Sequence, residues 1–147
     1  METYQELLKR QQKEFNDFPM IFAFNNKQLE SGMKQLGLTI SDLNKVYQGY
    51  GGIFYRKTDA PKLKEMNARH KSEFHKGINE DMTGEGFIFQ MFDYHLSNHE
   101  YCITNDLTDT LDTLGILLET VREHKALNHG LQLAINNQQR RKDETDS

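Results

Sequence analysis

Residues 84–106 read GEGFIFQMFDYHLSNHEYCITND, the densest apolar and histidine-bearing stretch of the chain. A helix over residues 86–100 would be apolar around most of its circumference, which is typical of a helix buried on several sides. Its polar positions form one stripe at three- and four-residue spacing: Gln90, Asp93, Ser97 and Glu100. We therefore expect a central helix with the stripe facing water or a partner.

Short runs rich in aromatic and β-branched residues suit strands better than helices. They are Met20–Phe24, Val46–Gln48, Ile53–Arg56 and, as a candidate fourth strand, Tyr101–Thr104. The sequence Gly-Tyr-Gly-Gly at residues 49–52 predicts a hairpin turn between the second and third runs. A phosphate-binding loop is disfavoured there, because such a loop opens a helix and here a strand follows.

Helical periodicity and capping residues predict further helices around this sheet. They cover residues 2–16, a segment from Asn25 or Asn26 closed by Gly37, and residues 58–79, 108–114, 119–125 and 128–139. The predicted fold class is α+β: a small antiparallel sheet of three to four short strands, packed by five or more helices around a central hydrophobic helix.

The chain of 147 residues has the size of one domain, which we expect over residues 1–139. The entirely polar segment 140–147 is expected to be disordered. The single cysteine, Cys102, and the lack of an apolar N-terminal run predict a cytoplasmic protein. No apolar run approaches the roughly 20 residues of a membrane span, so no membrane partner is expected.

Residues 77–121 contain no Lys or Arg and 9 Asp and Glu residues. Such a segment repels nucleic-acid phosphate, so direct nucleic-acid binding is not expected, and it attracts a basic protein surface. The alternative is a solvated face that maintains solubility. The predicted partner-binding residues are Asp93, Glu100, Asp106, Asp109 and Asp112.

His95 and His99 share one face of the predicted central helix, which is the spacing two imidazoles need to reach one metal ion. With Glu100 they form a candidate site for one divalent transition metal such as zinc, and a metal-binding protein or hydrolase is the alternative function. The zinc-protease pattern HExxH is absent, because the glutamate follows the second histidine. No other arrangement of catalytic side chains is evident, which favours a protein that is not an enzyme and needs no cofactor.

Residues 79–85 resemble the first half of a calcium loop, with oxygen-bearing side chains and a glycine in the sixth place. The pattern then fails, because Gly86 stands where an apolar residue belongs and Gln90 cannot supply a bidentate carboxylate. The segment is better explained as a turn between two helices that ends in the cap of the central helix.

Several segments together resemble a family of small proteins without assigned function that occur in phages, plasmids and genomes of low-GC Gram-positive bacteria. These segments are FPMIFAFNNKQ (18–28), GGIFYRK (51–57), GEGFIFQMFDYHLSNHEYCIT (84–104) and DTLDTLGI (109–116). The resemblance implies an accessory protein of a mobile element that binds a host factor.

The sequence therefore predicts a non-enzymatic accessory or regulatory protein whose acidic central segment binds another protein. A basic or nucleic-acid-binding host protein fits this surface, and inhibition of a host defence is one form of that role. The aromatic content also favours a homodimer.

Overall fold

The computed structural model describes residues 1–146, which form two compact units. The helical unit consists of Met1–Arg10 together with the chain from Ser72 onward, and the sheet unit consists of Gln11–Lys71. Two helices contribute residues to both units: α1 (Tyr4–Asp17) and α3 (Ala60–Glu80). The single domain predicted over residues 1–139 stays a prediction, since two compact units can belong to one domain.

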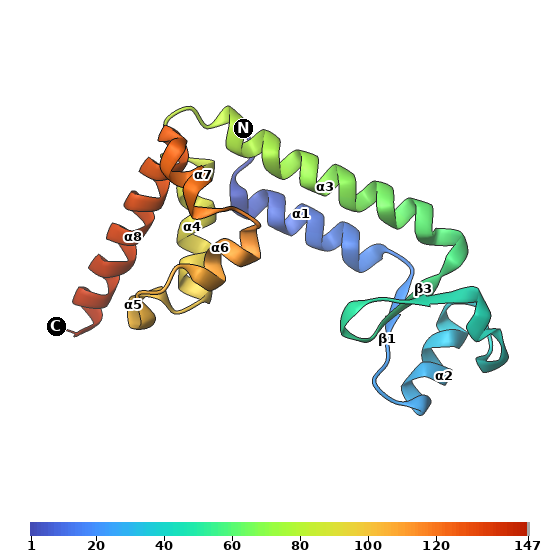
Figure 1. Ribbon diagram of the computed structural model, residues 1–147. Helices are drawn as coiled ribbons and strands as arrows, with labels where there is room; N and C mark the ends of the chain where they lie inside the picture. The colour runs from blue at the N-terminus through green and yellow to red at the C-terminus, as the bar shows by residue number, and fades with distance from the viewer. Residues whose placement is uncertain (147) are drawn as a thin grey trace. The chain divides into compact units, whose positions relative to one another are not determined.

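The sheet unit contains a three-stranded antiparallel sheet with the strand order β1-β3-β2 (Figure 1). Its strands are β1 (Met20–Phe22), β2 (Val46–Gln48) and β3 (Ile53–Arg56). The predicted hairpin is confirmed, and Gly51 and Gly52 in its turn have positive φ angles of 70° and 80°. Strand β1 is shorter than predicted because the Phe24 N–H donates to the Gln28 side chain at 2.8 Å, at the start of the next helix.

Helix α2 (Asn26–Gln35) packs on one face of this sheet. The Asn25 side chain caps it by accepting a hydrogen bond from the Gln28 N–H at 2.8 Å. Gly32 lies so close to Ile21 that an added Cβ would overlap the Ile21 side chain. The glycine therefore lowers helix propensity but permits close packing of helix on sheet. Short 3₁₀ turns connect the elements of this unit: η1 (Ile40–Lys45), η2 (Tyr50–Gly52) and η3 (Lys57–Asp59).

Helix α4 (Phe87–Asn98) forms the core of the helical unit, which confirms the predicted central helix. Its fully buried side chains are Ile88, Met91, Phe92 and Leu96. The helices that follow α4 in this unit are α5 (Tyr101–Thr104), α6 (Thr108–Leu114), α7 (Leu118–Glu123) and α8 (Lys125–Asp146). Helix α8 runs alongside α4 and makes the most extensive contact with it (Figure 1).

The segment Tyr101–Thr104 is a single helical turn and not the fourth strand that its apolar residues suggested. Glu100 and Asn105 on either side adopt the left-handed conformation, with φ angles of 54° and 56°. The Thr104 N–H donates to the Glu100 carbonyl at 3.1 Å and the Asn105 N–H donates to the Tyr101 carbonyl at 2.8 Å, so the backbone between them is coiled and not extended. Local β propensity is overridden here by the path that the chain takes around α4.

Helix α8 continues to Asp146 and so includes residues 140–146 of the polar segment for which disorder is predicted. Ser147 lies outside the described residues. Glutamine, arginine and lysine are good helix formers, and the Gln139 side chain donates to Asp143 one turn later at 3.3 Å. A polar composition thus extends a helix that packing against α4 has already established. No helix in the described chain combines the length and apolar character needed to cross a membrane.

The loop before α4 is organised by the buried carboxylate of Asp81. Its oxygens accept hydrogen bonds from the backbone N–H groups of Gly84 at 3.0 Å, Gly86 at 3.1 Å and Ile88 at 2.9 Å. Asp81 therefore satisfies donors at the start of α4 that the helix itself leaves unpaired. This confirms a capped turn between helices as the account of residues 79–85.

We expect Asp81→Ala to lower the free energy of unfolding by about 2 kcal/mol or more, because buried N–H groups would lose a charged acceptor. Chemical denaturation followed by circular dichroism measures the change. Glu80→Ala is the matched control, since Glu80 is exposed and its contact with Lys76 is a surface ion pair at 3.6 Å. Equal effects of the two substitutions would show that Asp81 does not stabilise the start of α4.

Candidate functional site

A polar network joins α4 to α8 through two of the four residues of the predicted polar stripe. The Asp93 carboxylate accepts hydrogen bonds from the side-chain amides of Asn137 and Gln138, both at 2.8 Å. The buried Gln138 amide also donates to the Ser97 hydroxyl at 2.9 Å. At the start of the stripe, the Gln90 side chain accepts from the backbone N–H of Tyr4 at 2.9 Å. These side chains therefore form hydrogen bonds within the unit, Ser97 is also exposed to water, and contact of the stripe with a partner stays a prediction.

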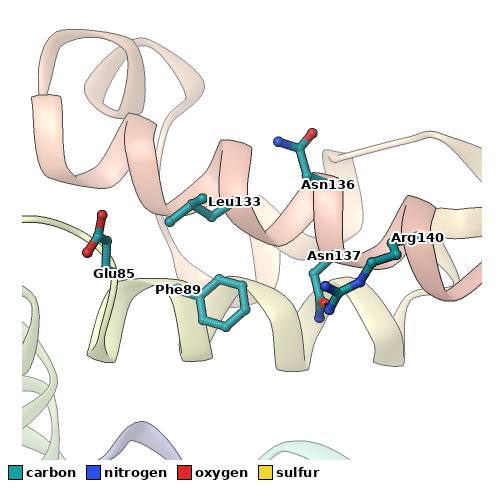
Figure 2. A pocket seen from close by; sticks show the side chains of 6 residues that line it. All are labelled: Glu85, Phe89, Leu133, Asn136, Asn137 and Arg140. Atoms are coloured by element: carbon teal, nitrogen blue, oxygen red, sulfur yellow. The ribbon is translucent and has the colours of Figure 1, made fainter.

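Next to this network, a surface pocket of about 440 Å³ lies between α4 and α8. We call it the α4–α8 groove, and it is lined by Glu85, Phe89, Leu133, Asn136, Asn137 and Arg140. Figure 2 shows the Phe89 ring and the Leu133 side chain between the two charged side chains, with Glu85 toward one end and Arg140 toward the other. The groove therefore combines an apolar middle with ends of opposite charge.

Both charged ends are oriented by hydrogen bonds. The Arg140 guanidinium donates to the Asn137 side-chain oxygen at 2.6 Å, and Asn137 in turn donates to Asp93. At the other end, Glu85 lies 3.2 Å from the His129 ring nitrogen of α8. The groove can thus accept an apolar side chain in the middle, a cation near Glu85 and an acceptor near Arg140.

The acidic residues predicted to bind a partner separate into two kinds. Asp93 is half-buried and occupied by α8, whereas Glu100, Asp106, Asp109 and Asp112 are exposed. Asp106 also accepts a hydrogen bond from the Thr108 N–H at 2.9 Å, and the hydrogen bonds to Thr108 lower its pKa. The exposed residues remain available to a partner, and Asp93 serves to hold the helices together.

The two histidines of α4 lie in a cluster with Tyr4 of α1. Their rings are stacked, with centroids 6.4 Å apart and an interplanar angle of 20°. The Tyr4 hydroxyl lies 2.6 Å from His95 Nε2, and His99 Nε2 lies 3.1 Å from the Thr113 hydroxyl. Burial lowers the pKa of His95, and the neighbouring His99 lowers it further. Burial and, to a smaller extent, Tyr94 raise the pKa of Tyr4.

The structure brings His95 and His99 together as the sequence predicted, but it adds no third ligand. Within residues 1–146, no group of three or more His, Cys, Asp or Glu side chains is placed to hold a metal ion. Glu100 follows His99 in the left-handed conformation at the end of the helix and is exposed. The hydrogen bonds at His95 and His99 instead attach α4 to α1 and α6.

Residues 3–137 match a protein family described as a family of unknown function (DUF7659). The chain belongs to this family. No curated protein and no solved structure matches the chain. Membership confirms the coarser part of the resemblance, a family without assigned function, while an origin in phages and plasmids stays a prediction.

Sequence reasoning missed the groove of this family member, although it placed Glu85 in the acidic segment. The sequence pattern marks Phe89 only as part of the apolar stretch 84–106 and places Arg140 in the polar segment 140–147. The signal in the sequence is the continuation of helix-forming residues beyond Gln139. Without the pairing of α4 and α8, however, nothing in the sequence relates Phe89 to Leu133.

The cluster around His95 predicts a specific dependence of stability on pH. The pKa of His95 in the folded chain lies below the ordinary value of 6.5. Just below pH 6.5, His95 therefore stays neutral in the folded chain, whereas the same side chain becomes protonated in the unfolded chain. Its contribution to stability is therefore complete above about pH 6.5 and is lost as the pH falls below that value. We expect His95→Gln to reduce the loss of unfolding free energy between neutral pH and about pH 5.

His75→Gln is the matched control, since His75 is exposed. Denaturation at both pH values measures the loss in each variant, and an NMR titration of the ring protons measures the pKa of His95 directly. An identical loss in the two variants would exclude His95 as the source of the pH dependence.

Proposed function

We propose that the protein is a non-enzymatic binding protein that holds a basic segment of another protein, with one apolar side chain of that segment seated in the α4–α8 groove. The supporting observation is the apolar middle of the groove within a strongly acidic unit. The helical unit contains 8 Lys and Arg residues against 16 Asp and Glu residues, a net charge of −8.

The groove has the size and lining of an anchor pocket. A volume of about 440 Å³ lies within the range of small-molecule pockets and accommodates a large side chain. Phe89 and Leu133 are both half-buried, so an occupant would remove further apolar surface from water. Binding energy at protein interfaces concentrates in such pockets, filled by aromatic or long aliphatic anchors.

The charges of the unit select the rest of the partner segment. Glu85 at the end of the groove suits a lysine or arginine next to the anchor. The exposed carboxylates Glu100, Asp106, Asp109 and Asp112 add long-range attraction for the same basic segment. This proposal keeps the acidic face predicted from the sequence and assigns Asp93 a supporting role beneath the groove.

The resemblance to proteins of mobile elements suggests where the partner would come from. Basic segments with apolar residues are common on nucleic-acid-binding proteins, so a host protein of this class is the proposed partner. Occupation of its basic surface would block nucleic acid from that surface, and this is how an inhibitor of a host defence would act.

We expect Leu133→Lys to weaken binding about tenfold or more, because it places a charge where the partner's apolar anchor would lie. The probe is a peptide selected from a random display library on the immobilised full-length chain, with affinity measured by calorimetry. Selected peptides should contain an aromatic or aliphatic residue next to Lys or Arg.

Gln132→Lys is the matched control, since it adds the same charge at the exposed neighbouring position. Glu85→Lys should weaken binding as well, whereas Glu119→Lys, an exposed acid outside the groove lining, should change it less. Peptides that bind the Leu133→Lys and Gln132→Lys variants equally well would place the binding site elsewhere.

A further inference from the structure

One face of the sheet in the sheet unit is turned away from helix α2. Side chains alternate between the faces of a strand, and residues paired across strands share a face. Ile21 and Val46 lie on the face that packs with α2. The opposite face, which we call the aromatic face, consists of the row Met20, Tyr55 and Tyr47 and the row Phe22 and Ile53.

The aromatic face exposes large rings to solvent. Phe22 is 56% exposed and Tyr47 is 46% exposed. At the adjoining end of the sheet, Phe24 and Tyr50 are exposed by 76% and 98%. Gly49 pairs with Ile53 through a 2.7 Å backbone hydrogen bond and completes the second row without a side chain. The result is an apolar face with exposed aromatic rings along its edge, a surface typical of a binding site.

The strands and turns of this face contain more basic than acidic side chains, and two of these cations, Lys45 and Arg56, form ion pairs with Asp42 and Asp59. Residues 18–29 and 43–58, which form the strands and their adjoining turns, contain 4 Lys and Arg residues and no Asp or Glu. The Lys57 ammonium lies 5.0 Å from the centroid of the Tyr47 ring. The whole sheet unit carries 10 Lys and Arg residues against 6 Asp and Glu residues, a net charge of +4.

We propose that the aromatic face binds single-stranded nucleic acid without sequence preference. Bases would stack on Phe22 and Tyr47, and Lys57 with the neighbouring basic side chains would hold the phosphates. Single strands expose the faces of their bases, and exposed aromatic rings beside basic side chains are the surface that binds them. Duplex DNA hides these faces and is not the expected ligand.

The charge favours this occupant over a second copy of the chain. Two sheet units meeting through this face would bring together two surfaces of the same charge. The acidic segment 77–121, which led us to expect no nucleic-acid binding, belongs entirely to the helical unit. The expectation from the sequence therefore applies to the helical unit and not to the aromatic face.

Fluorescence anisotropy of the full-length chain with labelled oligo-dT and oligo-U of about 20 nucleotides tests the proposal. Affinity should fall between about 50 and 200 mM salt. Phe22→Ala and Tyr47→Ala should each weaken binding about fivefold or more, the lower end of what one base–aromatic stack contributes. The matched control is Tyr94→Ala, which removes a tyrosine of the helical unit that is 40% exposed. It should change affinity less than about twofold, because Tyr94 lies outside the aromatic face.

Lys57→Gln should weaken binding and lower the slope of log affinity against log salt by about 1, while Lys64→Gln, an exposed lysine of α3, should leave the slope unchanged. Circular dichroism melting confirms that each variant is folded. The groove variant Leu133→Lys should bind the oligonucleotides normally, so this proposal and the proposed function can fail independently.

Three results would overturn the proposal. The first is an absence of binding to either oligonucleotide at low salt, and the second is binding that Phe22→Ala and Tyr47→Ala leave unchanged. The third is a dimer in analytical ultracentrifugation that dissociates in the same two variants, since this would show that a second copy covers the aromatic face.

Discussion

Burial of helix α4 requires that its polar groups find partners inside the protein. Asp81 provides an acceptor for backbone donors at the start of the helix, and Gln138 binds Asp93 and Ser97 farther along it. A buried polar group without a partner would lower the free energy of unfolding by more than an average hydrogen bond adds to it. Among the described residues, no buried side-chain nitrogen or oxygen lacks a partner. The apolar core of the helical unit therefore depends on a few well-placed polar side chains.

The same requirement determines where the groove lies. Gly84 and Gly130 bring the loop before α4 against α8 so closely that an added Cβ at either would overlap backbone atoms. Asp93, Asn137 and Gln138 then hold the two helices together farther along. Between these fixed points, Phe89 and Leu133 face each other with their surfaces partly open to solvent. The pocket is a consequence of how the two helices are joined.

The net charge of −4 conceals an uneven distribution between the two units. The helical unit carries −8 and the sheet unit +4, so the chain presents surfaces of opposite character. Such surfaces attract different partners: a basic protein segment in one case and phosphate in the other. The two proposed partners match this segregation, whereas the average composition suggests only an acidic protein.

The sequence by itself determined the central helix, the hairpin and the helix that ends before Gly115, because hydrophobic period and turn residues act over a few neighbours. Only the tertiary structure decided that Tyr101–Thr104 is helical, that α8 extends through the polar tail and that Asp93 faces α8. Each of these outcomes depends on contacts between residues far apart in the chain, such as the 44 positions between Asp93 and Asn137. A local sequence pattern predicts which residues are buried, but tertiary packing determines which residues of the chain contact each other.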